Sequence, residues 1–417
     1  MNRNDKRVKW ACYTSNISMA VVGNLSPLLF LTFRNLYGIS YSLLGLLVLI
    51  NFVTQLTVDL IFSFFSHKFN IPLAVKLTPY LTIGGLVLYA LAPILFPTQV
   101  YVGLVIGTVI FSAASGFCEV LISPVIAALP SDNPERDMSK LHSIYAWGVV
   151  GDILFATLFL LIFGARFWQI LALCFLLIPL SSAILFGGAK LPKMDTPEKA
   201  SGVLALLKKP ALWLCVFAIF LGGASECTMA QWCSGYLEEA MGIPKVWGDV
   251  FGVALFGFML GLGRTMYAKK GKQIERVLFL SAIGATVCYG TAALSGIPIL
   301  GLIACGMTGL FTAMLWPGSL IVAADRVPTG GVFIYAMMAA GGDLGASVGP
   351  QLVGVITDGV AANPAAWELA AKLGLSGEQL GMKCGVLVGM LFPLIAILVY
   401  LYIWRSKKRR ERLASNL

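Results

Sequence analysis

Residues 189–209 read AKLPKMDTPEKASGVLALLKK and form a polar, lysine-rich stretch near the middle of the chain. On both sides of it, the sequence consists of long apolar segments separated by short polar turns. A membrane-spanning helix needs about 20 mostly apolar residues, and six segments of this length precede the stretch while six follow it. The pattern therefore predicts an all-α membrane protein in which a cytoplasmic linker joins two six-helix bundles.

The apolar segments set the boundaries of twelve predicted transmembrane helices. They run over residues 10–33, 40–65, 73–95, 99–129, 142–164, 167–187, 210–237, 248–268, 275–295, 298–323, 331–357 and 382–404. A polar loop is predicted over 358–381, between the last two of them. The predicted domains are an N-terminal bundle (1–188), the linker (189–209), a C-terminal bundle (210–404) and a basic cytoplasmic tail (405–417).

Composition excludes several classes of protein. Of the 417 residues, 58% are hydrophobic and only 12% are charged, whereas a soluble globule needs a polar surface and a disordered chain has few apolar residues. The nine cysteines lack the CxxC spacing of metal or redox sites, so we expect no metal site and no bound cofactor. The HExxH and GxxxxGKS/T motifs are absent and the loops are too short for a nucleotide-binding domain, so no enzyme is predicted.

The net charge of +10 is explained by membrane orientation. When the N-terminus is placed in the cytoplasm, 25 of the 30 Lys and Arg residues lie on the cytoplasmic side, as the positive-inside rule requires. Both termini are therefore predicted to be cytoplasmic, and the basic excess does not indicate a nucleic-acid partner. We expect a monomeric, multi-pass protein of a bacterial inner membrane, with the lipid bilayer and a small-molecule substrate as partners.

Five acidic residues lie inside the predicted spans, away from the first and last turns: Asp59, Glu119, Asp152, Glu226 and Asp343. Ionisable groups are costly at membrane depth and therefore indicate function. No Lys or Arg lies near the centre of a span, so we expect these acids to lack basic partners. An unpaired acid in a low dielectric tends to be neutral, and it can carry a proton or hold a cation. Proton coupling is assigned to Glu119 and Asp343.

Helical spacing places polar side chains beside two of these acids. In 99–129, three serines share one face with Glu119: Ser112, Ser115 and Ser123. In 331–357, three residues share a face with Asp343: Tyr335, Ser347 and Gln351. Four glycines of this second span allow a neighbouring helix to approach closely: Gly341, Gly342, Gly345 and Gly349. Both stripes are typical of a cavity lining, and a hydrogen-bonded helix contact is the alternative.

Residues with hydrogen-bonding or aromatic side chains near mid-depth are the predicted substrate ligands. Aromatic rings stack on sugars or on organic cations, and an amide both donates and accepts hydrogen bonds. The predicted ligands are Asn24, Glu226, Gln231, Trp232, Tyr236, Tyr335 and Gln351. Four residues are assigned to gating: Asp59, one to two turns from the cytoplasmic end of its span, His142 near the mouth, Arg264 toward the cytoplasmic end of its span, and Asp152 within the span over 142–164.

Six spans, a basic linker and six more spans resemble the major facilitator superfamily. The resemblance implies two helical halves around a midplane site and transport by alternating access. Within that superfamily, SAASGFCEVLISP at 112–124 and FLGGASECTMAQWCSGYL at 220–237 resemble the fucose permease branch, placing Glu119 and Glu226 on its acids. Shorter matches are His142-Ser143 with Gly148, Gly263-Arg264, and Gly349-Pro350 with Gly354.

The chain departs from the family pattern in two places. His67-Lys68 stands where the superfamily carries Asp-Arg in the loop after the second span. The first span reads GNLSPLL at 23–29 and lacks the acid of the fucose permease.

The resulting hypothesis is a proton-coupled importer of a small hydroxylated solute, a monosaccharide or a sugar derivative. One alternative is a proton antiporter that exports organic cations or drugs, since acids and aromatic rings also suit a cation. A non-transporting membrane receptor is the third hypothesis. Sodium in place of the proton stays open.

Overall fold

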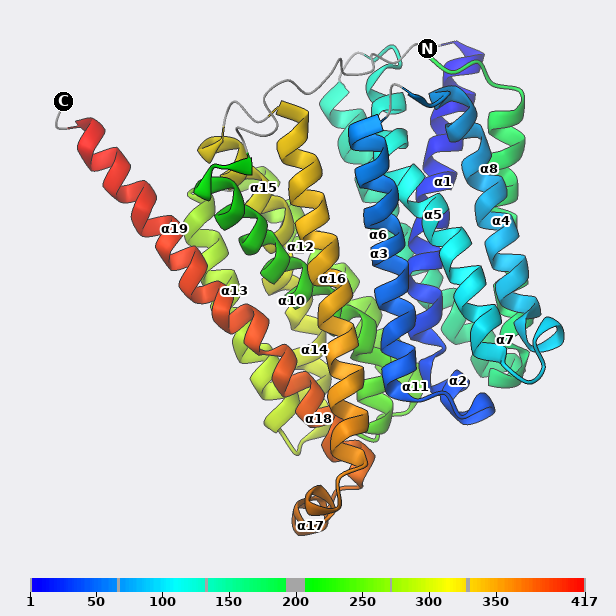
Figure 1. The fold of residues 1–417 in the computed structure, drawn as a ribbon, viewed down its shortest axis with the longest axis vertical. Coiled ribbons are helices and arrows are strands. Elements are labelled where there is room, and N and C mark those ends of the chain that lie inside the picture. Colours follow the sequence, from blue (N-terminus) through cyan, green and yellow to red (C-terminus); the bar gives the residue numbers. More distant parts are fainter. Residues whose placement is uncertain are drawn as a thin grey trace. The chain divides into compact units, whose positions relative to one another are not determined.

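The computed structural model describes residues 2–65, 68–131, 134–192, 207–270, 272–327 and 331–415. The chain forms two compact units, residues 1–200 and 201–417, and the described residues of each are helical (Figure 1).

The first unit contains eight α-helices and one short 3-10 helix (η2) among its described residues. They are α1 (Arg3–Leu28), α2 (Phe30–Tyr37), α3 (Tyr41–Phe65), α4 (Ile71–Leu95), α5 (Val100–Ala127), α6 (Pro134–Phe163), η2 (Ala165–Phe167), α7 (Trp168–Cys174) and α8 (Leu177–Gly187).

The first predicted span is bent. Helices α1 and α2 meet at Leu29 with a bend of 46°. Pro27 lies inside the last turn of α1, and a proline removes a backbone donor and crowds the preceding turn. The predicted span over 10–33 is therefore a broken pair of helices.

The second unit contains α10 (Pro210–Glu239), α11 (Lys245–Gly248), a π-helical turn η3 (Asp249–Ala254), α12 (Leu255–Lys270), α13 (Ile274–Leu294), α14 (Pro298–Thr312), α15 (Leu315–Arg326), α16 (Gly331–Ala361), α17 (Pro364–Leu373), α18 (Gly377–Gly389) and α19 (Leu391–Ser415). Its core gathers apolar side chains from α10, α13, α15, α16 and α19.

Among the described residues, nine helical segments are long and apolar enough to cross a membrane, or ten if the bent pair α1–α2 counts as one span. The chain is thus an all-helical multi-pass membrane protein. The full count of twelve spans and the cytoplasmic position of both termini stay predictions.

The predicted loop over 358–381 is wrong, because it contains the helix α17. Asn363 caps this helix by accepting a hydrogen bond from the Ala365 amide, and Pro364 stands at its first position. Gly374 ends it in the left-handed conformation, with φ of 68°. Asparagine before proline and a glycine about ten residues later are the sequence signals of such a helix.

The tail predicted at 405–417 is largely helical. Helix α19 continues to Ser415 and lies beside α13 in Figure 1. Lys407 Nζ lies 2.8 Å from Glu275 Oε1, and the Glu275 side chain is only 4% exposed. Arg410 lies 3.0 Å from Asp325. Two basic residues of this segment therefore form ion pairs with acids of α13 and α15, and the segment is not simply a solvated chain end.

Candidate functional site

A polar contact runs along helices α3 and α5 of the first unit. Ser112 Oγ donates to Asn51 Oδ1 at 2.6 Å, and both side chains are buried. The helices come close at Gly116, where a Cβ atom would lie 2.8 Å from Val58 Cβ. Gln55 and Asp59 follow Asn51 at four-residue intervals, so all three share one face of α3. Ser112 of the stripe predicted on 99–129 therefore contacts the polar face of α3, whereas the side chain of Ser123 lies outside the described residues.

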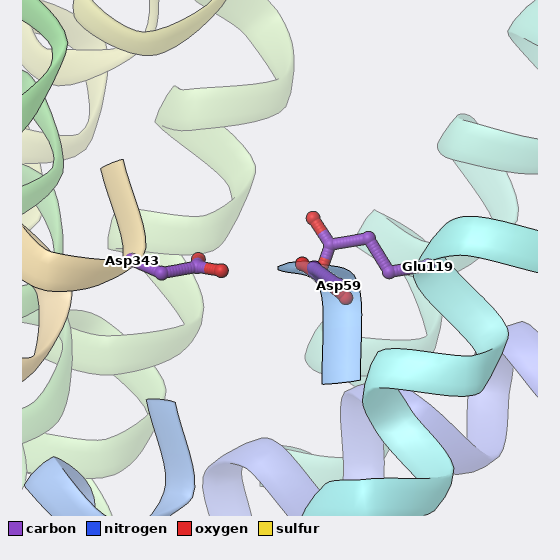
Figure 2. A group of neighbouring side chains, drawn as sticks. All are labelled: Asp59, Glu119 and Asp343. Atoms are coloured by element: carbon purple, nitrogen blue, oxygen red, sulfur yellow. The ribbon is translucent and has the colours of Figure 1, made fainter. Parts of the chain in front are cut away.

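Two carboxyl groups lie together at this contact. Oxygen atoms of Asp59 and Glu119 come within 4.8 Å of each other, and Figure 2 shows the two side chains side by side. Asp59 is buried, at 4% exposure, and Glu119 is half-buried. Like charges at this separation repel strongly in a low dielectric, so a proton or cation held between them is favourable.

The pairing of these acids was not predicted from the sequence, which assigned Glu119 to coupling and Asp59 to gating. Periodicity shows which residues of one helix share a face. It does not show which residue of another helix lies opposite.

Glu226 has a basic partner, contrary to the expectation that the acids inside spans lack one. Arg264 Nη2 donates to both carboxylate oxygens, at 3.1 and 3.2 Å. The arginine Nε also donates to the Ala313 carbonyl, at 3.1 Å. The Glu226 side chain is 14% exposed and that of Arg264 is 40% exposed, so this ion pair joins α10 to α12 with the carboxylate mostly buried and the arginine partly exposed. Arg264 was noted in the sequence as part of the Gly263-Arg264 match. Its pairing with Glu226 was not predicted, because the two are 38 residues apart along the chain.

Replacing Arg264 by alanine is expected to lower the free energy of unfolding by about 2 kcal/mol, because a mostly buried carboxylate loses its charged donor. The thermal-unfolding midpoint of the purified protein in detergent measures the loss. Arg276→Ala is the matched control, since Arg276 is exposed on α13. The double variant Glu226→Gln/Arg264→Ala should regain part of the stability, because the buried charge is removed. A double variant less stable than Arg264→Ala would show that Arg264 does not stabilise the protein by pairing with Glu226.

Trp232 and Tyr236 lie inside the helix packing of the second unit, each at 1% exposure. The Trp232 indole donates to the Pro350 carbonyl at 2.8 Å. The Tyr236 hydroxyl donates to the Ala292 carbonyl at 2.5 Å. Their polar atoms therefore already serve helix contacts, and the predicted stacking on a ligand is not what this geometry favours.

Two amide side chains of this unit have spare hydrogen-bonding capacity. Neither Gln231 Oε1 on α10 nor Gln351 Oε1 on α16 accepts a hydrogen bond from any described residue. They adjoin in sequence the Trp232–Pro350 hydrogen bond, which joins the same two helices. A buried amide oxygen without a donor favours a ligand with hydroxyl groups.

Helices α10 and α16 pack closely, as the glycine stripe predicted. A Cβ atom at Gly341 would lie 2.8 Å from Val216 Cγ1, and one at Gly345 would lie 2.9 Å from the Ala224 nitrogen. Asp343 is on this stretch of α16 and is 3% exposed.

Residues 345–349 match GxSxG, the hydrolase nucleophile motif. A nucleophile needs a strand-to-helix turn, whereas Ser347 lies mid-helix and donates to the Asp343 carbonyl.

The remaining predicted site residues have different surroundings. Asn24 is half-buried on α1, and its amide donates to the Ala20 carbonyl at 2.7 Å. Asp152 is buried on α6, and neither carboxylate oxygen bonds to a described residue. The side chains of Tyr335 and His142, like residue His67, lie outside the described part of the structure.

Sequence reasoning missed one buried ion pair near the beginning of the predicted span 248–268. Lys245 Nζ lies 3.1 Å from Asp249 Oδ2, and Asp249 is 1% exposed. Ser234 of α10 donates to the same carboxylate. The spacing of four residues between the lysine and the aspartate was the available signal.

Two compact helical units with long apolar helices and buried ionisable groups define a multi-pass protein of the membrane. Residues 11–350 match the sequence profile of the Major Facilitator Superfamily, and the chain belongs to this family. Membership makes it a transporter rather than an enzyme, with a small-molecule substrate and the lipid bilayer as its partners.

Solved transporters share the fold at low sequence identity. A bacterial homologue of the human lysosomal transporter Spinster has a TM-score of 0.70 and 11% identity, covering 97% of this chain and 98% of that chain. The nucleoside transporter NupG has a TM-score of 0.69 and 11% identity, covering 96% of this chain and 100% of that chain. The E. coli fucose:proton symporter FucP has a TM-score of 0.58 and 14% identity, covering 94% of this chain and 99% of that chain. A search of curated proteins finds no match.

Proposed function

We propose that this transporter takes up a small hydroxylated solute, a monosaccharide or a sugar derivative, together with protons. The observation that carries the proposal is the pair of carboxyl groups, Asp59 and Glu119, within 4.8 Å of each other at a buried polar contact. A shared proton relieves their repulsion. Loss of that proton restores it, so the protonation of the pair favours one arrangement of the helices over another.

The coupling follows from the cost of charge at membrane depth. With a proton bound, the pair carries less charge and the loaded carrier reorients at lower cost. Release of the proton on the cytoplasmic side then favours release of the solute. Asp343 is the second proposed proton carrier, and it lies on the helix that carries Gln351.

The proposed solute ligands are the groups of the second unit that have unused hydrogen-bonding capacity or charge. The oxygens of Gln231 and Gln351 accept from solute hydroxyls, and the Glu226–Arg264 pair offers both acceptors and donors. Asn24 of the first unit is a further proposed ligand. The proposal is also supported by the fold shared with a fucose:proton symporter.

The proposal includes a location and an assembly state. We place the transporter in a bacterial inner membrane as a monomer with both termini in the cytoplasm, because the Lys and Arg distribution favours that orientation.

The test starts with a screen for stabilising compounds, because a ligand that binds the folded state raises its unfolding midpoint. Monosaccharides, polyols, amino sugars and lipophilic cations are compared. Each stabilising compound, radiolabelled, is then offered to proteoliposomes whose lumen is alkaline. Accumulation above equilibrium that a protonophore abolishes is the expected result. Accumulation under a sodium gradient alone would identify sodium, not the proton, as the coupling ion. Binding without flux under either gradient would favour the receptor hypothesis.

A further inference from the structure

A hollow with a volume of about 490 Å³ lies on the first unit, on helices α1, α6, α7 and α8. It is separate from the acid pair, which lies on α3 and α5. Its lining is almost entirely apolar and includes the rings of Trp147, Phe155 and Phe175. Trp147 is 66% exposed and Leu177 is 72% exposed. Large exposed apolar side chains of α6 and α8 therefore flank the hollow, where a hydrophobic molecule can reach it.

One charged residue, Asp152, is part of this apolar lining. Its side chain is 3% exposed, and no described residue donates a hydrogen bond to either oxygen. Leaving a carboxylate in such surroundings is costly unless a partner compensates it. A neutral acid at this position needs a hydrogen-bond partner and an ionised one needs a cation, and no described residue supplies either.

The backbone leaves room beside the carboxylate. Gly151 is exposed, and a Cβ atom built there would meet nothing within 4 Å. Gly148, one turn earlier, packs against α1 instead, with a Cβ position 3.3 Å from Ala20 Cβ. The open space thus lies on the exposed side of α6, at the residue next to Asp152.

We propose that this hollow, the α6 groove, binds a hydrophobic small molecule that carries one basic amine. The apolar lining takes the body of the molecule, the ammonium group pairs with Asp152, and Trp147 offers a ring face to the cation. A volume of about 490 Å³ suits a drug-sized molecule.

The chemistry of the groove disfavours a phospholipid as the occupant. Asp152 precedes the end of α6 at Phe163 by eleven residues, which places it about 16 Å from that end at 1.5 Å per residue. On the predicted span over 142–164 this position is near the middle, away from lipid headgroups. A lipid phosphate would also be repelled by the carboxylate.

The test uses the full-length protein in lipid nanodiscs and two photoactivatable probes. One is a benzophenone that carries a tertiary amine, and the other is its uncharged analogue with carbon in place of nitrogen. Labelled peptides are mapped by mass spectrometry. We expect the amine probe to label peptides of α6 and α8 about tenfold more than the analogue, as loss of one charged contact implies.

Three variants decide the outcome. Asp152→Asn should reduce labelling by the amine to the level of the analogue, and Gly151→Leu, which fills the groove, should remove labelling by both. Gly187→Leu is the matched control, because Gly187 is exposed and lies outside the groove. The unfolding midpoint of each variant confirms that it folds. Equal labelling by both probes in the natural protein, unchanged labelling in Asp152→Asn, or labels confined to other helices would overturn the proposal.

Discussion

Glu119→Gln is expected to abolish uphill accumulation of the solute while leaving exchange intact. Glutamine keeps the shape and hydrogen bonds of the protonated acid, but it cannot release a proton, so Asp59 no longer has a titrating partner. With one proton per solute, a pH gradient of one unit supports about tenfold accumulation. The variant should fall to the equilibrium level, as measured by radiolabelled uptake into proteoliposomes under an inside-alkaline gradient.

Two further variants test the same assignment. Glu368→Gln is the matched control, because Glu368 is exposed on α17 and should accumulate solute like the natural protein. Asp59→Asn removes the other member of the pair and should also lose accumulation. Full accumulation by Glu119→Gln would separate this carboxyl group from proton coupling, whatever the solute is.

Gly345→Ala is expected to lower the free energy of unfolding by about 3 kcal/mol, because overpacking a helix contact forces backbones apart. The added Cβ atom would lie 2.9 Å from the Ala224 nitrogen and would also press on the Phe220 carbonyl. Both obstacles are backbone atoms of α10, which cannot turn aside as a side chain can. Thermal unfolding of the purified variant in detergent measures the loss.

Gly359→Ala is the matched control on the same helix, since a Cβ atom there would meet nothing within 4 Å. Alanine favours a helix over glycine by about 1 kcal/mol, so this variant should be as stable as the natural protein or slightly more stable. Equal losses in the two variants would show that α10 and α16 do not need a glycine at their contact.

Several features of the protein were predictable from the sequence because they depend on neighbouring residues. Apolar length indicates a membrane-spanning helix, and a 100° turn per residue placed three serines on the face of Glu119. Gly345 and Gly349 were predicted to allow a close helix contact, and the structure confirms it against α10. Even the helix at 364–373 had its capping signals in the sequence.

The contacts between helices were decided only by the tertiary structure. Asp59 meets Glu119 because α3 and α5 adopt one rotation and one register. Arg264 reaches Glu226 across 38 residues of chain, and Lys407 reaches Glu275 from a segment that reads as a solvated tail. The groove around Asp152 needs four helices to exist at all. Local spacing fixes which side of a helix a residue occupies. Which residue lies opposite depends on the simultaneous packing of side chains from several helices, and no single segment of the sequence determines that packing.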